Sequence, residues 1–237
     1  MATNRYERIT ANDGGGFDAY CAIPDSGSGP GLLVFQEIFG INDNIRDLSD
    51  RFAAAGYVVL APDMFWRLEP RFERKDESGI GDAFAMVQKF DFAQGVEDIQ
   101  ATHAHLLGMT ECTGKVGGVG FCLGGGLAFA MAALSRVDGQ GPDGAVSYYG
   151  SAVNAFLEHA DKVECPVLFH YGDTDAFIPA ENVTEVEKTF AGRDDIEIVH
   201  YDAGHAFANN DAPSMYNAEA AALAWDRTLG FFARTLS

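Results

Sequence analysis

The clearest chemical signal in the sequence is the pentapeptide of residues 120–124, which reads Gly-Phe-Cys-Leu-Gly. It follows a continuous apolar segment and precedes an apolar segment of helical length. It matches the Gly-x-Ser-x-Gly nucleophile elbow with cysteine in place of serine. Glycines two residues before and after the nucleophile let a strand and a helix approach closely. The spacing therefore predicts that Cys122 is a nucleophile.

The predicted position of Cys122 at the start of a helix adds to this chemistry. A helix N-terminus stabilises a thiolate, and the backbone N–H of Leu123 is placed there to bind an oxyanion. A dinucleotide fingerprint beginning at Gly118 would need glycine at position 123, and no Lys-Ser or Lys-Thr of a P-loop follows. The alternative is a buried cysteine in a glycine-rich crossing, but the order of strand, motif and helix favours the elbow.

An elbow of this kind requires an acid and then a histidine later in the chain. Of the four histidines that follow Cys122, His170 and His200 lie in predicted strands, where we expect them to pack. His159 lies in a polar segment and is expected to be solvated. His205 follows a strand in a loop that can carry it over the sheet, and it is the predicted catalytic base.

The acid is expected at the end of the preceding strand. Asp173 and Asp175 both stand there, and spacing alone leaves either able to reach the imidazole of His205. Asp202 is a third candidate, but it is too near His205 in sequence to face its ring.

Alternating strands and helices must position these residues. The pattern predicts one α/β domain over residues 1–237, with a mainly parallel sheet covered by helices on both faces. Strands are predicted over residues 6–9, 17–23, 31–36, 57–61, 115–120, 144–149, 166–171 and 196–201, and helices over residues 43–55, 94–107, 123–136, 181–190 and 214–234.

Residues 66–80 interrupt this alternation. They carry four basic and four acidic side chains. We interpret the segment as a charged excursion from the core and a candidate lid.

Composition excludes several classes of function. The chain has 237 residues, with 16 Lys and Arg against 35 Asp and Glu, a net charge of −19 that disfavours nucleic acid and anionic membranes. The longest apolar run, residues 127–134, is far short of the roughly 20 residues of a membrane span. The four cysteines form no Cys-x-x-Cys pair, so we expect no metal, no cofactor and reduced thiols. A cytoplasmic monomer or weak homo-oligomer is expected.

The sequence also resembles the dienelactone hydrolase family. The resemblance rests on Gln-Glu-Ile-Phe-Gly at residues 36–40, Pro-Asp at 62–63, Gly-Phe-Cys-Leu-Gly-Gly at 120–125, Tyr-Tyr-Gly at 148–150 and Gly-His-Ala-Phe at 204–207. It covers nearly the whole chain and implies an α/β-hydrolase fold with a Cys-Asp-His triad. It selects Asp175 over Asp173, because the family's acid stands just before the Ile-Pro segment.

The resemblance further implies a role for Glu37. In the family this carboxylate contacts the resting thiol and is displaced by an anionic substrate. A charged side chain directly after an apolar strand is costly if it is buried without a partner, which favours function over a capping role. The amide of Ile38 would be the second oxyanion donor, and we assign Phe39, Tyr149 and Phe207 to the substrate pocket.

The sequence departs from the family at the substrate pocket. The two arginines that bind the substrate carboxylate in the family correspond here to Ile80 and Asn209, and a pocket Tyr and Trp correspond to Phe84 and Val87. The pocket is therefore expected to be more apolar. Basic residues of the excursion that could restore a cation are Arg67, Arg71 and Arg74.

These observations predict a hydrolase of lactone or ester bonds acting on a small molecule. One alternative is a carboxylesterase or thioesterase for neutral substrates on the same fold. Another is a non-catalytic binding protein, against which the joint presence of Cys122, Asp175, His205 and Glu37 argues.

Overall fold

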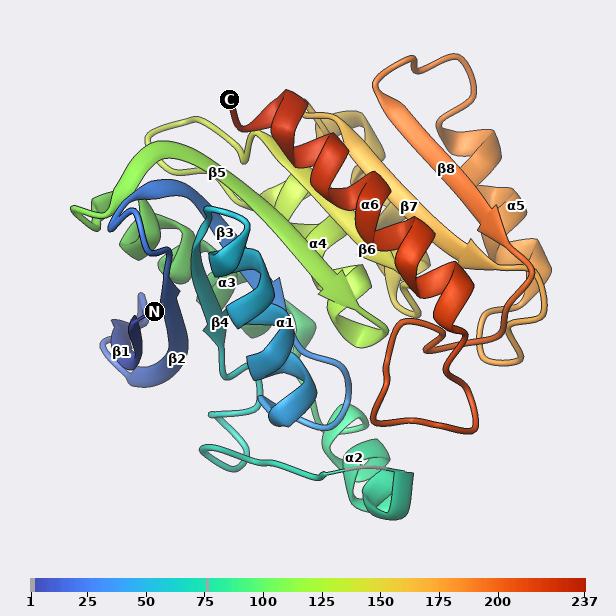
Figure 1. The fold of residues 1–237 in the computed structure, drawn as a ribbon, viewed down its shortest axis with the longest axis horizontal. Coiled ribbons are helices and arrows are strands. Elements are labelled where there is room, and N and C mark those ends of the chain that lie inside the picture. The colour runs from blue at the N-terminus through green and yellow to red at the C-terminus, as the bar shows by residue number, and fades with distance from the viewer. Residues whose placement is uncertain (1–2, 76) are drawn as a thin grey trace.

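The computed structural model describes residues 3–75 and 77–237. Within them, eight strands form one sheet in the order β1-β2-β4-β3-β5-β6-β7-β8 (Figure 1). Pairing is antiparallel between β1 and β2 and between β2 and β4, and parallel in the rest of the sheet. The strands are β1 Thr3–Thr10, β2 Gly16–Ile23, β3 Gly29–Phe35, β4 Val58–Pro62, β5 Cys112–Phe121, β6 Gly144–Tyr148, β7 Val167–Gly172 and β8 Ile196–Tyr201.

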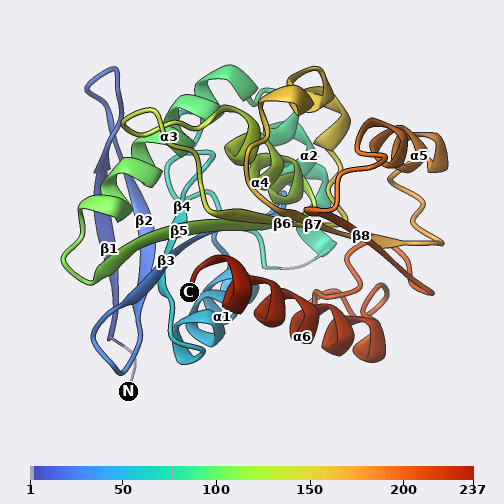
Figure 2. The same cartoon turned by 90° about the horizontal axis from the view of Figure 1, so that it is seen from above.

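Helices cover both faces of this sheet, as Figure 2 shows edge-on. On one face lie α1 and α6, and on the other lie α3, α4 and α5, whereas α2 lies beyond the ends of the strands in the lower part of Figure 1. The α-helices are α1 Asp43–Ala54, α2 Ile80–Val87, α3 Phe92–Gly108, α4 Leu123–Leu134, α5 Ala180–Thr189 and α6 Ala218–Thr235, and the 3₁₀ segments are η1 Glu77–Gly79 and η2 Val153–Lys162. The predicted fold class is confirmed.

Local sequence explains most of these boundaries. At α1 the side chain of Asn42 accepts a hydrogen bond from the amide of Ile45 and so caps the first turn. At α6 the cap is Asn217, and the helix therefore begins four residues later than predicted. Neither α2 nor η2 was predicted: α2 is short, and neither segment has a side-chain hydrogen bond that caps its first turn.

The charged excursion, of which the structure describes residues 66–75 and 77–80, is folded onto the body of the protein. Phe65 and Phe72 are buried and meet edge to face with ring centroids 5.7 Å apart. The carboxylate of Asp63 accepts hydrogen bonds from the amides of Phe65 and Arg71. The segment is thus anchored at several points, although most of its charged side chains are exposed as expected.

None of the helices in residues 3–75 and 77–237 combines the length and the apolar character that a bilayer span requires. Parallel pairing brings the carboxyl ends of β3, β5, β6, β7 and β8 to one edge of the sheet. The loops after these five strands carry, in that order, Glu37, Cys122, Ser151, Asp175 and His205.

Candidate active site

Cys122 occupies a strained turn between β5 and α4. Its φ is 54° and its ψ is −115°, which side-chain-bearing residues rarely adopt. A Cβ atom on Gly120 would lie 1.8 Å from the carbonyl oxygen of Gly124, and one on Gly124 would lie 2.3 Å from that of Phe35. The two flanking glycines are therefore required by close backbone approach, as the elbow motif predicts.

His205 and Asp175 form a buried pair at the ends of β8 and β7. His205 Nδ1 lies 2.7 Å from Asp175 Oδ2, and the two side chains are only 7% and 4% exposed. The other oxygen of Asp175, Oδ1, accepts hydrogen bonds from the amides of Phe177 at 2.8 Å and Ile178 at 3.1 Å. The carboxylate is thus fixed by its own loop and in turn fixes the orientation of the imidazole.

The surroundings of His205 favour its charged form. Burial alone would lower its pKa, but the hydrogen bond to Asp175 and the neighbouring sulfur of Cys122 raise the pKa to about 10. The ring lies between two aromatic side chains, with centroids 5.2 Å from Tyr149 and 5.0 Å from Phe177. This arrangement suits a thiolate–imidazolium pair.

Ser151 is a neighbour of the sulfur that the sequence analysis missed. Its Oγ lies 3.8 Å from Cys122 Sγ, and its amide donates to the carbonyl of Cys122 at 3.1 Å. The signal available in the sequence was its place at the end of a predicted strand, directly after Tyr-Tyr-Gly.

Glu37 is buried and held by two donors. Asn209 Nδ2 donates to one carboxylate oxygen at 2.6 Å, and the hydroxyl of Tyr149 donates to the other at 3.3 Å. Burial raises the pKa of Glu37, while His205, Asn209 and Tyr149 oppose this rise. Among the hydrogen bonds of the described residues, Glu37 has none to the thiol, unlike the resting contact that the resemblance implies.

A cavity of about 170 Å³ opens beside the cysteine. Nine of the predicted site residues line it: Glu37, Ile38, Phe39, Ile80, Phe84, Cys122, Leu123, His205 and Asn209. Tyr149 and Phe207, also assigned to the pocket, are fully buried behind this lining and contact each other. Six further residues complete the wall, of which only Val87 was considered from the sequence: Val87, Ser151, Phe177, Ala206, Ala212 and Met215.

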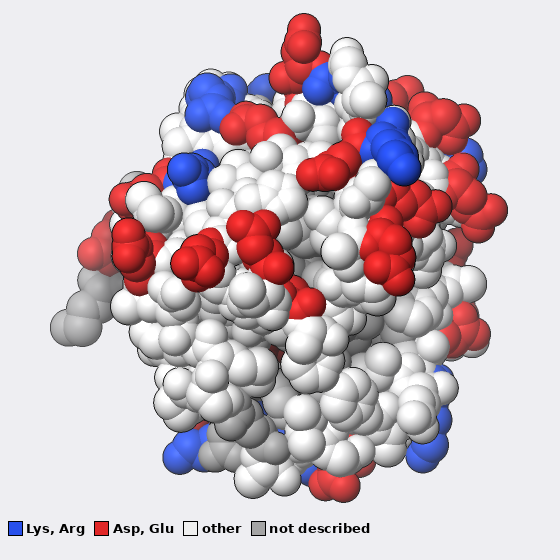
Figure 3. Space-filling view, turned by 90° about the vertical axis from the view of Figure 1, so that its right-hand side faces the viewer, with Lys and Arg blue, Asp and Glu red and all other residues white. Residues whose placement is uncertain are grey.

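No Lys or Arg is among the described residues that line this cavity. The excursion arginines pair elsewhere: Arg67 with Asp98 and Asp13, Arg71 with Asp18, and Arg74 with Asp82. In Figure 3, acidic side chains gather over the upper part of the face that bears α5 and β8, and the lower, hollowed part is mostly uncharged. Ile80 and Asn209, which stand where the resemblance places the family's two arginines, both line this cavity.

The remaining histidines and cysteines lie in different surroundings. His170 is buried, as expected, and contacts Tyr201 and Thr228. The expectation that His200 packs was wrong, because it lies exposed on edge strand β8 between two carboxylates.

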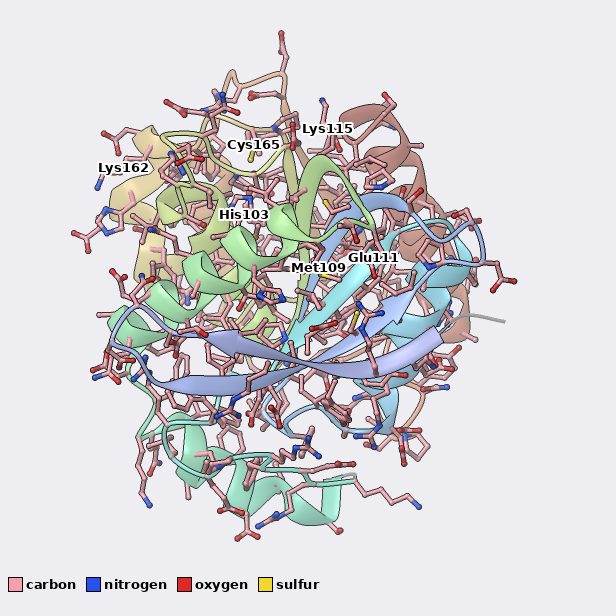
Figure 4. The ribbon with its side chains drawn as sticks, turned by 90° about the vertical axis from the view of Figure 1, so that its left-hand side faces the viewer. His103, Met109, Glu111, Lys115, Lys162 and Cys165 are labelled. Atoms are coloured by element: carbon pink, nitrogen blue, oxygen red, sulfur yellow. The ribbon has the colours of Figure 1, made fainter. Side chains whose placement is uncertain are left out.

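Figure 4 shows another part of the molecule, with His103 and Cys165 labelled. Burial lowers the pKa of His103 to about 4, and the ring lies 3.0 Å from Ser135. Burial raises the pKa of Cys165, and likewise that of Cys21, to about 12, and it also raises that of Cys112. Within residues 3–75 and 77–237, no three His, Cys, Asp or Glu side chains lie together in a group able to hold a metal ion.

Known proteins similar to this chain point to one family. The model of the dienelactone hydrolase family matches residues 17–236. The carboxymethylenebutenolidase of Pseudomonas sp. strain P51 is 36% identical over 228 residues, which cover 95% of this chain and 93% of that protein. A proposed dienelactone hydrolase from Klebsiella pneumoniae subsp. pneumoniae MGH 78578 superposes over 99% of both chains with a TM-score of 0.84 and 30% identity. A dienelactone hydrolase-like promiscuous phosphotriesterase from metagenomic libraries superposes over 99% of both chains, with a TM-score of 0.81 and a sequence identity of 25%.

Proposed function

The chain belongs to the dienelactone hydrolase family, and from that premise we propose that it hydrolyses ester or lactone bonds with Cys122 as nucleophile. In this proposal His205 is the base and proton donor, and Asp175 orients it. The observation that carries the proposal is the buried 2.7 Å contact between His205 Nδ1 and Asp175 Oδ2 beside a cysteine in a strained elbow.

The reaction proceeds through a thioester. The Cys122 thiolate attacks the carbonyl carbon, and the amides of Leu123 and Ile38 bind the oxyanion. The imidazolium of His205 gives its Nε2 proton to the departing alkoxide oxygen as the C–O bond breaks. His205 then removes a proton from water, the hydroxide attacks the thioester, and the C–S bond breaks to release the acid and restore the thiolate.

Neutral substrates with an apolar acyl group fit the cavity best. Among the described residues that line it there is no Lys or Arg for a substrate carboxylate, and the acidic side chain of Glu37 is part of the same wall. This favours a neutral-substrate esterase or lactonase over an enzyme for anionic lactones. A thioesterase uses the same chemistry and differs only in the leaving group.

For Glu37 we propose a role that differs from the one implied by the family resemblance, in which the carboxylate contacts the resting thiol until an anionic substrate displaces it. Asn209 and Tyr149 occupy its two oxygens, so the carboxylate is retained away from the thiol in the absence of substrate. The thiolate would then be available without an anionic trigger, which suits neutral substrates.

For the segment of residues 66–80 we propose a supporting role. Its ion pairs Arg67–Asp98 and Arg71–Asp18 anchor it to the body. It leads into α2, whose Ile80, Phe84 and Val87 lie at helical spacing along the cavity wall. The candidate lid is thus proposed as a fixed wall.

Replacement of the nucleophile tests the function. Cys122→Ala is expected to abolish turnover of a neutral activated ester while the protein stays folded by circular dichroism, and Cys122→Ser to leave at most weak activity. Cys112→Ala, at a partly exposed cysteine outside the cavity, is the matched control and should behave as the unchanged protein.

Labelling separates an enzyme from a binding protein on the same fold. Iodoacetamide followed by peptide mapping should modify Cys122 before the other three cysteines. Wild-type turnover in Cys122→Ala, or an unreactive Cys122, would contradict the proposal.

A further inference from the structure

Phe177 has no part in the mechanism described above, yet it is exposed at the active site. It is 51% exposed, the highest fraction among the large apolar side chains of the described residues. It lines the cavity beside Cys122, and its ring centroid lies 5.0 Å from that of His205. An exposed aromatic side chain at a catalytic cavity is a candidate ligand contact.

The loop of the catalytic acid fixes Phe177 in place. Its amide donates to Asp175 Oδ1 at 2.8 Å, and the amide of Ile178 donates to the same oxygen at 3.1 Å. The carboxylate that orients the histidine therefore also holds the backbone from which the phenyl ring projects, and the ring itself packs against His205. An aromatic ring on an ordered backbone loses less conformational entropy on binding than one on an unordered loop.

The position of His205 decides which part of a substrate Phe177 meets. Nδ1 of the imidazole is bound to Asp175, so Nε2 is the atom that delivers a proton to the leaving oxygen. The leaving group must lie beside this ring. Tyr149 covers the ring from within the protein and is fully buried, whereas Phe177 contacts it from the exposed side.

We infer that Phe177 forms a leaving-group subsite that selects esters of apolar alcohols, with a preference for those bearing an aromatic ring. In a lactone the same subsite takes an apolar substituent on the carbon bonded to the ring oxygen. The inference rests on the proposed function and names a substrate class for it.

The size of the cavity supports two separate regions for the substrate. A cavity of about 150 Å³ in another protein holds one benzene, so the 170 Å³ here suits an acyl group of about one ring. An apolar alcohol must then extend to the mouth. Phe177 and the 42% exposed Phe84, which both line the cavity and face solvent, are available to contact it there.

Methyl and benzyl esters of one short neutral acid test the subsite, because their alcohols have similar acidity and differ mainly in the ring. We expect the unchanged protein to show a kcat/KM for the benzyl ester at least about tenfold above that for the methyl ester, equivalent to about 1.4 kcal/mol. Phe177→Ala should reduce this ratio to about one, mainly by raising KM for the benzyl ester. Phe177→Leu, which keeps apolar contact area, should retain an intermediate ratio.

Two controls isolate the leaving-group contact from support of the histidine. Leu223→Ala removes an apolar side chain on α6 that is 46% exposed and lies outside the cavity, and it should leave the ratio unchanged. The alkaline limb of the pH profile, set by His205, should stay in place in Phe177→Ala. Equal losses for both esters, or a displaced limb, would show that Phe177 only supports His205 and would overturn the inference.

The outcomes also distinguish the two proposals. Hydrolysis of both esters at equal kcat/KM by the unchanged protein would overturn the subsite and leave the hydrolase function standing. Hydrolysis of neither ester, with an unreactive Cys122, would overturn the function and the subsite with it.

Discussion

Two histidine–aspartate pairs lie close together in this molecule and differ mainly in their surroundings. His205 lies 2.7 Å from Asp175, and His200 lies 2.9 Å from Asp173. The first two side chains are 7% and 4% exposed, whereas the second two are 39% and 56% exposed. Distance alone therefore does not separate the pair proposed to act in catalysis from a hydrogen-bonded pair at the surface.

The difference lies in what surrounds each pair. The amides of Phe177 and Ile178 fix Asp175, two aromatic rings flank His205, and Cys122 is its neighbour. His200 instead has a second carboxylate, Glu187, on its other nitrogen at 3.1 Å. With both ring nitrogens directed at acidic side chains near solvent, it has no geometry for passing a proton to a substrate.

Removing each acid in turn gives the largest expected contrast. Asp175→Asn should lower kcat by up to about 10⁴-fold, the loss seen in serine triads when the imidazole is held in the wrong tautomer. Asp173→Asn should change kcat less than about threefold. Steady-state kinetics on one neutral ester measures both. A larger loss in Asp173→Asn would show that the exposed pair supplies the acid.

The charge of the substrate gives the next comparison between the two pairs. His205 lines the cavity beside Cys122, whereas His200 and Asp173 do not. A missing charge-assisted hydrogen bond costs about 1.5–3 kcal/mol, so two missing contacts correspond to a factor of roughly 10²–10⁴ in affinity. We expect poor activity on dienelactone and a higher kcat/KM on the neutral methyl ester of such a lactone carboxylate.

The excursion arginines provide the counter-test for substrate charge. Arg71 and Arg74 are paired with Asp18 and Asp82 and should not contribute to binding. A preference for the anionic lactone that Arg71→Ala or Arg74→Ala reduces would contradict the neutral pocket.

A smaller effect is expected from releasing Glu37. In Asn209→Ala the carboxylate loses its 2.6 Å donor and can approach the thiol and compete with His205 for it. Loss of one such bond, about 1.5–3 kcal/mol, predicts a decrease in kcat/KM on a neutral ester of roughly ten- to a hundredfold. The double variant Asn209→Ala with Glu37→Gln should recover most of the activity. Failure of this rescue would show that Asn209 acts on packing and not through Glu37.

The sequence was most informative where local patterns and function coincide. Cys122 and His205 could be proposed as catalytic residues because the elbow motif and the strand ends are local signals. The choice of Asp175 over Asp173 came from the family resemblance, since two acids two residues apart have equal reach and only burial separates them. His200 was misjudged because periodicity does not tell an edge strand such as β8 from an inner one.

The pocket wall was the least predictable part of the site. Helix α2 is short, uncapped and apolar on more than one side, so Ile80 and Phe84 were assigned to the pocket only by resemblance. Ser151 and Phe177 come to the cavity from the loops after β6 and β7, and their proximity to Cys122 depends on strand order. Long-range pairing of this kind leaves no trace in a single sequence.

The smallest expected effect is that of breaking the exposed pair. Exposed ion pairs typically contribute about 0–1 kcal/mol, so His200→Asn should change the free energy of unfolding in urea by less than about 1 kcal/mol and kcat by less than about twofold.

The pH profile gives the sharper comparison. Because the pKa of His205 is raised to about 10, its imidazolium persists at neutral pH, and proton delivery to the leaving group should fail only as the pH rises through about 10.

We expect the decrease of kcat/KM at alkaline pH to be set by the buried pair of His205 and Asp175. It should be unchanged in His200→Asn and should move to lower pH in Asp175→Asn, because loss of the carboxylate removes a contribution that raises the pKa of His205. The measurement is kcat/KM on one neutral ester across pH 6 to about 11, in buffers of constant ionic strength. A limb that moves in His200→Asn and stays in place in Asp175→Asn would reverse the roles of the two pairs.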